Sequence, residues 1–360
     1  MTVEPGHDGE VQITVATDYD AGTWDDYVGR SDLDGHFHDF AWRGIIHRAL
    51  HHRPLYLIAR RGETVTGLLP LFDVKSRLFG RSLVSVPFLN GGGLVASDRA
   101  STAALLAKVD DIVRHGGYRY SELRQRDPLG GDEAKTLTCR QHKVAMRLPL
   151  GDDAGALFKT FNGKLRIQVR RPSKAGAKTQ VINGSNVVNR DLDAFYKVFS
   201  ENMRDLGKPV YPQLLFKETV EGFKERVWLV IVWMDDHPAA AGLMIGAGTS
   251  VEMIWASSLR CFYGLSVNML LYWEAMRSAL DQGYRTFDFG RCTPDSPIYH
   301  FKAQWGAKPT TLHWYYAEGS GDVPDVSSDN PKFRAAVRTW QILPVAVANR
   351  LGPILARSLP

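Results

Sequence analysis

Short apolar runs and one longer amphipathic stretch follow each other in the same order in both halves of this 360-residue chain. In the first half, apolar runs bounded by turn residues predict strands at residues 55–60, 65–72, 82–88, 118–123 and 143–148. Apolar positions at helical spacing predict helices at residues 41–51 and 100–115. The longer helix is expected to start after an N-cap at Ser97 or Asp98 and to end at Gly116-Gly117.

The second half repeats this plan, with strands expected at residues 227–233, 239–245, 251–256 and 285–289 and a helix at 265–280. Gly117-Tyr118-Arg119 and Gly283-Tyr284-Arg285 open the equivalent last strands, which carry Glu122 and Asp288 at matching positions. The shared order and these matched residues predict a duplicated α/β unit with a mixed central sheet in each copy.

Composition and length fit this interpretation. A chain of this size suggests roughly two domains. Lys and Arg number 44 against 39 Asp and Glu, a net charge of +5, which permits a phosphate-bearing or membrane-surface partner without requiring one. Three scattered cysteines favour a reducing compartment. No secretory signal or spanning run is visible, so we expect a cytoplasmic protein, with peripheral contact at the inner membrane as an alternative.

The expected organisation has four parts. Residues 1–20 are expected to be a flexible tail, residues 21–150 the first domain, residues 151–320 the second domain, and residues 321–360 a basic amphipathic tail. Histidines crowd the start of the first domain, at His36, His38, His47, His51 and His52. They lack a third ligand at a familiar spacing, so we expect surface or capping histidines and no metal site.

The segment at residues 159–178 is basic and contains no acid. Arg166, Arg170, Lys174 and Lys178 recur every fourth residue, which would place them on one face of a continuous helix. Pro172 is expected to kink or end that helix near Arg171. An unpaired cluster of this kind suits phosphates, and a solvated charged face is the alternative.

The C-terminal tail is also basic, with no acidic residue after Asp329. Arginines and a lysine punctuate its apolar positions, and Pro344 and Pro353 are expected to break the run. Two interpretations stay open: short amphipathic pieces that lie on an anionic bilayer, or a tail that packs back on the second domain.

Residues 287–306 combine an acid, a guanidinium and an amine with aromatic neighbours, a costly arrangement unless those charges are paired or used. Amide formation from an activated ester needs a cation or an amide donor for the oxyanion, and Lys302 is the candidate. The attacking amine must lose a proton, to Asp288 or Glu122 directly or through water. Tyr299 and His300 are expected to orient substrate. The alternative for Asp288 and Arg291 is a structural salt bridge.

The chain resembles the FemAB-like transferases, and in particular the branch found beside exosortase and exopolysaccharide genes in Gram-negative bacteria. The resemblance spans about residues 20–317. The residues that carry it are Leu69-Pro70-Leu71, Val74-Lys75-Ser76, Leu78-Phe79-Gly80, Ser85-Val86-Pro87-Phe88, Glu122-Leu123-Arg124, residues 166–176, residues 203–207 with Pro209, residues 287–291, Phe301-Lys302 and Trp305-Gly306.

This resemblance implies two tandem GNAT-like domains and amide-forming acyl or aminoacyl transfer onto a cell-envelope or exopolysaccharide precursor. It implies that Lys302 stabilises developing negative charge and that Arg166 and its neighbours lie near the acceptor's phosphates. The expected catalytic residues are Lys302, Asp288 and Tyr299. The expected substrate-binding residues are Arg166, Arg170, Arg171, Arg204, Arg291 and Trp305.

The donor stays open between aminoacyl-tRNA and acyl-CoA, and no tightly bound cofactor is expected. Residues 259–266 only partly match a pyrophosphate-binding loop, with Arg260 and Gly264 but no second glycine. The expected acceptor is a phosphate-bearing sugar or a lipid-linked molecule. Two alternative functions remain: an acyl-CoA-dependent N-acetyltransferase of the same fold, and a non-catalytic binding or assembly protein of an export system.

Overall fold

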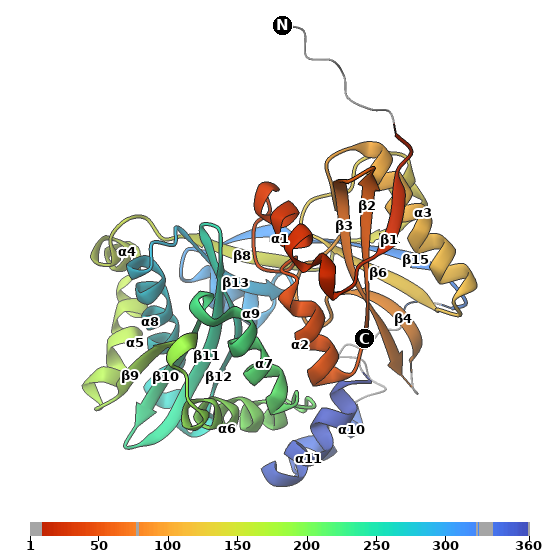
Figure 1. The fold of residues 1–360 in the computed structure, drawn as a ribbon. Coiled ribbons are helices and arrows are strands. Elements are labelled where there is room, and N and C mark those ends of the chain that lie inside the picture. Colours follow the sequence, from red (N-terminus) through yellow and green to blue (C-terminus); the bar gives the residue numbers. More distant parts are fainter. Residues whose placement is uncertain (1–8, 77–78, 322, 324–333, 359–360) are drawn as a thin grey trace, which may run out of the picture.

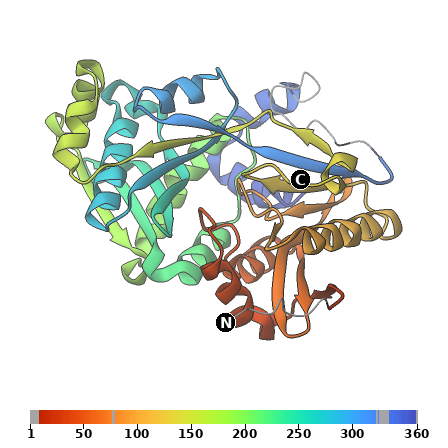
Figure 2. The same cartoon turned by 90° about the horizontal axis from the view of Figure 1, so that it is seen from above.

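The computed structural model describes residues 9–76, 79–321, 323 and 334–358. Two mixed sheets lie side by side, each flanked by helices (Figures 1 and 2). Leu78, one of the residues that carry the family resemblance, falls outside the described residues. Lys332 of the expected basic tail also falls outside them.

The first sheet has the strand order β1-β2-β3-β4-β6-β15-β7, and β5 pairs with β3. Its strands are β1 (Gln12–Val15), β2 (Arg53–Arg61), β3 (Thr64–Ser76), β4 (Gly80–Ser85), β5 (Val95–Ala96), β6 (Tyr120–Gln125), β7 (Thr138–Arg140) and β15 (His313–Glu318). Its helices are α1 (Ala21–Arg30), α2 (Ala41–Leu50) and α3 (Arg99–His115). Because β1 pairs with β2, residues 12–15 of the expected flexible tail belong to the fold.

The second sheet has the order β14-β8-β13-β12-β11-β10-β9. Its strands are β8 (Val144–Pro149), β9 (Lys178–Asn183), β10 (Val227–Met234), β11 (His237–Ala247), β12 (Ser250–Ser258), β13 (Thr286–Cys292) and β14 (Lys308–Thr311). The helices of this half and of the tail are α4 (Ala154–Thr160), α5 (Gly163–Lys174), α6 (Asn189–Asp205), α7 (Gln213–Phe223), α8 (Val267–Asp281), α9 (Pro297–Ala303), α10 (Arg334–Gln341) and α11 (Val345–Ala356).

The two sheets exchange strands. Strand β8 comes before the expected domain boundary at residue 150, yet it pairs with β13 and β14 in the second sheet. Strand β15 comes from the second half and pairs with β6 and β7 in the first sheet. The boundary at residue 150 therefore does not separate the two sheets.

The duplicated plan is present in the structure. The series β2-β3-β4-α3-β6 and β10-β11-β12-α8-β13 follow each other in the same order. Each series contains one parallel ladder that is only three residues long. The ladder between β4 and β6 ends at the pair of Val84 and Glu122. The ladder between β12 and β13 ends at the pair of Glu252 and Asp288. Beyond these pairs the strands separate. We call the two gaps the first opening and the second opening.

An apolar core joins the halves. Helix α2 of the first half packs on α7 of the second, and both contribute to one continuous cluster of buried side chains. Trp42 and Ile45 of α2 and Phe216 and Phe223 of α7 are almost fully buried in it. Truncating one of these aromatic residues to alanine would cost about 3–5 kcal/mol of stability. This packing fixes the two openings next to each other.

Two expected helix breaks are absent. Helix α5 continues through Pro172 to Lys174, and α11 continues through Pro353 to Ala356. Each proline lacks the N–H that would bond the carbonyl oxygen four residues earlier, so each helix gives up one backbone hydrogen bond and continues for two or three more residues. No helix in the described ranges combines the length and the apolarity that crossing a bilayer requires.

Candidate active site

The second opening begins at two buried carboxylates on neighbouring strands. Glu252 of β12 and Asp288 of β13 are register partners, and both side chains are almost fully buried. Residues of the first half partner both of them. Arg126 forms an ion pair with Asp288, and Asn90 Nδ2 donates to Glu252 Oε1 at 2.6 Å.

His36 completes this cluster. Its Nε2 lies 3.2 Å from Glu252 Oε2, an ion-pair distance without the alignment of a hydrogen bond. Its Nδ1 accepts a hydrogen bond from Trp42 Nε1 at 3.2 Å. A ring whose Nδ1 accepts carries its proton on Nε2, which then faces the carboxylate.

The two carboxylates differ in their electrostatics. Burial raises the pKa of Asp288, and the positive charge of Arg126 offsets this only in part. Burial acts in the same direction on Glu252, but His36, Arg126 and Asn90 together hold the pKa of that carboxyl below its usual value. Asp288 is therefore the one of the pair that gains a proton more readily.

Gly290 turns the chain directly after Asp288. Its φ is +71°, a conformation that L side chains rarely adopt, and its N–H donates to Asp288 Oδ1 at 2.8 Å. The ladder between β13 and β8 shifts register between Asp288 and Arg291. This bulge turns the carbonyl oxygens of residues 290 and 291 toward Lys302.

Lys302 lies in α9, a short helix with Ser296 as N-cap and Pro297 in its first turn. Its Nζ donates to the carbonyl oxygens of Gly290 and Arg291, both at 2.9 Å. Burial lowers the pKa of Lys302 below the ordinary value of a lysine. An ammonium group has three N–H donors, so one remains beyond the two that hold the bulge.

Arg291 is a half-buried cation that forms no ion pair within the described residues. Its guanidinium and that of Arg124 both lie about 5 Å from the centre of the Trp314 ring. Burial, and then the charge of Arg124, lower the pKa of Arg291 to about 10. Its Nη1 has no hydrogen-bond partner in the described structure.

The ion pair considered between Asp288 and Arg291 is not formed. Asp288 pairs with Arg126 of the first half, and the bulge at Gly290 places Arg291 beside Trp314. In the first opening, Arg124 takes the role that Lys302 has in the second. Its Nη1 donates to the carbonyl oxygens of Val86 and Leu89, and its Nε pairs with Glu122 at 2.5 Å.

The remaining predicted residues lie in other places. Tyr299 is half-buried and packs edge-on against His300. Trp305 is buried in an aromatic cluster. Arg204 of α6 pairs with Asp205 and donates to the carbonyl oxygen of Leu343, and so contacts the C-terminal tail. The structure therefore brings together Asp288, Arg291 and Lys302, but not Arg204.

The basic residues of α5 line one border of the second half. Arg166 is half-buried, whereas Arg170 and Arg171 are exposed. Arg170 stacks over the Phe158 ring, and Arg171 Nη1 donates to the carbonyl oxygen of Gly264 at 3.1 Å. Within the described residues, no acid forms an ion pair with any of the basic side chains of α5.

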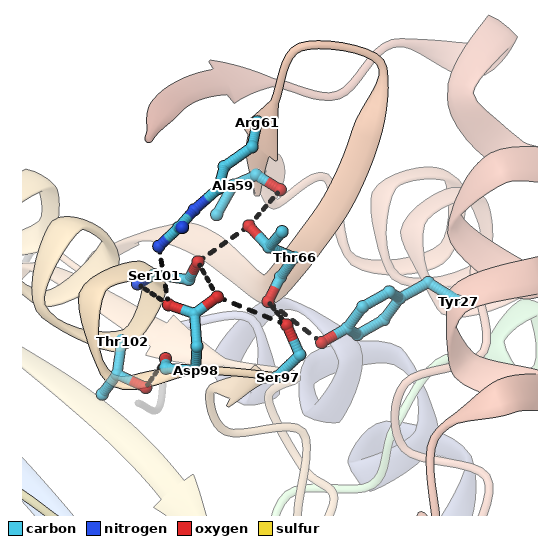
Figure 3. Close-up of polar contacts among 8 residues, drawn as sticks. All are labelled: Tyr27, Ala59, Arg61, Thr66, Ser97, Asp98, Ser101 and Thr102. Carbon is cyan, nitrogen blue, oxygen red and sulfur yellow. Dashed lines mark hydrogen bonds and ion pairs between the residues drawn. The ribbon is translucent and has the colours of Figure 1, made fainter. Parts of the chain in front are cut away.

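Gly264 belongs to the loop before α8, and this loop differs from its counterpart before α3. The N-cap of α8, Ser266, has a φ of +61° and makes no side-chain capping bond. At α3, Asp98 accepts from the N–H of Ser101 at 2.8 Å and pairs with Arg61 (Figure 3). A carboxylate therefore already occupies the anion-favouring end of α3.

Sequence reasoning missed His36, Asn90, Arg126 and Glu252 as members of the site. The histidine cluster and the Asn90-Gly91-Gly92-Gly93 run were visible in the sequence, but neither pattern indicates a partner far along the chain. Arg126 and Glu252 carry no local signal.

One cavity of about 630 Å³ is lined by residues of α4, the end of β8 and residues 303–306, including Trp305. Another, of about 420 Å³, lies between β2, β4 and α3. Neither of these two is lined by Asp288, Arg291 or Lys302.

Part of the chain matches a known domain family. Residues 163–303, from the start of α5 to the end of α9, match the model of the acetyltransferase (GNAT) domain family. The match includes Glu252, Asp288 and Lys302. No curated protein matches the chain in sequence.

Several solved structures have the same fold. FemX is 13% identical, with a TM-score of 0.62, and the alignment covers 91% of this chain and 100% of FemX. The C-terminal domain of a putative lysylphosphatidylglycerol synthetase from Agrobacterium fabrum is 13% identical (TM-score 0.57, 89% of this chain, 94% of that one). A tandem GNAT protein from the clavulanic acid biosynthesis pathway is 12% identical (TM-score 0.57, 88% and 100%).

At these identities the structural likeness shows the fold, and the family match adds the class of reaction. Residues 163–303 form an acyltransferase domain of the GNAT fold, and the chain as a whole has the fold of two such domains in tandem.

Proposed function

We propose that the protein transfers an acyl or aminoacyl group to an amine of a cell-envelope or exopolysaccharide precursor and so forms an amide bond. The family match supports acyl transfer. The fold is shared with FemX and with a domain of a putative lysylphosphatidylglycerol synthetase. These neighbours make a phosphate-bearing or lipid-linked acceptor and an aminoacyl donor reasonable starting points.

The chemistry at the second opening follows from its charges. The amine nitrogen attacks the carbonyl carbon of the activated donor, a C–N bond forms, and negative charge develops on the carbonyl oxygen. The remaining N–H of Lys302 is the donor for this oxyanion. The bond to the leaving oxygen or sulfur then breaks.

The amine must lose one proton, and the leaving group must gain one. Asp288, whose pKa is raised by burial, accepts the proton through water and returns it to the leaving group. Arg126 keeps the carboxylate charged until the proton arrives. Tyr299 lies in the first turn of α9, three residues after the N-cap Ser296, and orients the substrate at the second opening.

The observation that carries the phosphate-bearing acceptor is the unpaired basic face of α5. Arg166, Arg170 and Lys174 follow each other at four-residue spacing, and no described carboxylate neutralises them. Exposed cations of ordinary surfaces usually alternate with acids, as in the pair of Arg114 and Asp110 on α3. Phosphate oxygens would supply the missing negative charge.

A second candidate, an acyl-CoA-dependent acyltransferase, is favoured by one specific contact. Arg171 reaches the loop before α8, whose first turn has no side-chain cap. Backbone N–H groups at a helix start bind pyrophosphate, and an arginine beside them adds charge.

The test is a transfer assay with candidate donors, with the amide product detected by mass spectrometry. The donors are aminoacyl-tRNA and acetyl-CoA, offered with a nucleotide-sugar precursor that carries a free amine. We expect product with the aminoacyl donor. Product with acetyl-CoA alone would establish the second candidate instead, and absence of product with either donor would count against both.

The triple variant Arg166→Gln, Arg170→Gln, Lys174→Gln tests the role of α5. We expect KM for the phosphate-bearing acceptor to rise at least about tenfold with kcat nearly unchanged, because the lost contacts bind substrate and transition state alike. Arg114→Gln removes an exposed charge elsewhere and should leave KM unchanged. An unchanged KM in the triple variant would exclude α5 as the phosphate-binding face.

A further inference from the structure

The C-terminal helix α11 packs against the second half with its smallest residues. Ala348, Gly352 and Ala356 recur every fourth residue and are buried. A Cβ at Gly352 would lie 2.7 Å from the side chain of Val210, so the helix approaches that backbone closely. Hydrogen bonds from Arg204 to the carbonyl oxygen of Leu343 and from Gln341 to that of Asp205 tie the segment to α6.

An adjoining face of α11 carries the large apolar residues. Val347, Leu351, Ile354 and Leu355 recur at helical spacing, and with Ile342 before the helix they are between 40% and 81% exposed. Amphipathic helices normally bury such residues and expose small or polar ones. Here the order is reversed, and an apolar strip faces outward. We call these five residues the tail strip. Figure 1 shows α10 and α11 at the edge of the molecule beside α6.

The charged residues of the tail itself have one sign. Arg334, Arg338 and Arg350 are exposed, and no acidic residue follows Asp329 in the sequence. In the described part of the tail, none of the arginines forms an ion pair. A second copy of the chain on this strip would bring like charges together, because the same surface would meet itself. An anionic surface is the complementary partner.

We propose that the tail strip docks on the surface of an anionic lipid bilayer. The aliphatic side chains enter the boundary between headgroups and acyl chains, and the arginines bind lipid phosphates. Packing back on the protein and binding a membrane, which the sequence left as alternatives, are thereby both satisfied by two adjoining faces of one helix. The inference does not depend on which acyl group or acceptor the active site uses.

The docked position would also orient the active site. Arg357, just after α11, lies close enough to His52 to affect its pKa, and His52 stacks on Phe88. Phe88 packs on Tyr211, whose neighbours include Arg291. The tail therefore lies beside the interface between the halves, where the second opening also lies. An acceptor held in the membrane would then be close to that opening.

Flotation of the full-length protein with vesicles tests the proposal. The probes are vesicles of phosphatidylcholine alone and of phosphatidylcholine with one-third phosphatidylglycerol. We expect flotation only with the second kind, and release at 1 M salt to be partial because the apolar contacts remain. The variant Leu351→Glu, Ile354→Glu should reduce the bound fraction at least tenfold. Arg338→Gln, Arg350→Gln should weaken binding less.

The matched control is Val15→Glu, because Val15 is a comparably exposed apolar residue (50%) on β1 of the first half. It should bind vesicles like the unmodified protein. Equal binding by the tail-strip variant, or no vesicle binding by the unmodified protein, would overturn the proposal. A tail-strip variant that lowers the molecular mass in solution would also overturn it, in favour of a contact between copies. Transfer to a water-soluble acceptor should not change in any of these variants.

Discussion

The starts of α3 and α8 occupy equivalent places in the two halves, but only α3 has a side-chain cap. At α3, Asp98 caps the helix and forms an ion pair with Arg61 (Figure 3). Thr66 accepts hydrogen bonds from the hydroxyl groups of Ser101, Ser97 and Tyr27. At α8 no side chain caps the first turn, and Arg171 lies beside it. In the first half a side chain therefore caps this helix start, whereas in the second half no side chain does.

The two openings differ in the same way. In the first, Glu122 pairs with Arg124 on its own strand, and Arg124 also holds the nearby carbonyl oxygens. In the second, Asp288 draws Arg126 from the other half, and Lys302 of α9 holds the bulge. The carboxylate of the first opening therefore pairs within its own half, whereas the carboxylate of the second pairs across the two halves. Under the proposed function, the second opening carries the reaction and the first supports the fold.

The largest expected effect separates these two arrangements. Arg126→Met leaves Asp288 buried without its cation, and we expect the free energy of unfolding to fall by about 3–5 kcal/mol. Denaturant titration measures this change. The double variant Arg126→Met, Asp288→Leu should recover part of the loss, because neither charge is then left alone.

Two controls make that comparison sharp. Arg124→Met should cost a similar free energy of unfolding, but hydrogen exchange should rise within the first half and not across the interface. Arg114→Met removes an exposed ion pair and should cost less than about 1 kcal/mol. A loss below 1 kcal/mol for Arg126→Met would show that the ion pair does not join the halves.

A smaller effect concerns acid, because His52 of the first half is buried and neutral. Burial lowers the pKa of His52 to about 4, against an ordinary value of 6.5. Between pH 6.5 and pH 4 the unfolded state binds a proton at His52 and the folded state does not. The free energy of unfolding therefore keeps its full value above pH 6.5 and falls as the pH drops toward 4. The loss is about 3 kcal/mol over that range.

His52→Gln should abolish this part of the pH dependence. Unfolding of both proteins at pH 7 and pH 4.5, followed by hydrogen exchange, should show β2 and β3 losing protection first in the unmodified protein only. The same pH dependence in His52→Gln would assign the acid sensitivity to another group.

Much of the scaffold could be predicted from the sequence because its signals are local. The runs that became β2, β3, β10 and β11 alternate or are continuously apolar, and Gly117 and Gly283 mark equivalent helix ends. Asp98 as N-cap follows from residue type and position. Lys302 and Arg291 stood out because charges between aromatic residues need an explanation.

The exchange of β8 and β15 could not be predicted, because a strand's own pattern does not say which sheet it joins. The same holds for the site residues from the first half. Nothing around Arg126 indicates that its partner is Asp288, since that contact exists only after α2 and α7 have packed. The prolines of α5 and α11 misled the prediction because the loss of one backbone hydrogen bond did not end either helix at the proline.

The smallest expected effect concerns the closed end of α3. Asp98→Ala removes its N-cap, and we expect the free energy of unfolding to fall by about 1 kcal/mol with unchanged turnover. Calorimetry and the transfer assay measure the two quantities on the same sample. Reduced turnover at full folding would mean that the α3 end takes part in the reaction, and the division between the halves would then be wrong.

The central claim is that the reaction takes place at the second opening and depends on Lys302. The most direct measurement is single-turnover transfer by Lys302→Met, beside its melting temperature and the turnover of Glu122→Gln in the first opening. We predict a folded Lys302→Met protein whose transfer rate is lower by at least about 100-fold, and a Glu122→Gln protein with a nearly normal rate. A normal rate in Lys302→Met, or a loss confined to Glu122→Gln, would contradict the account.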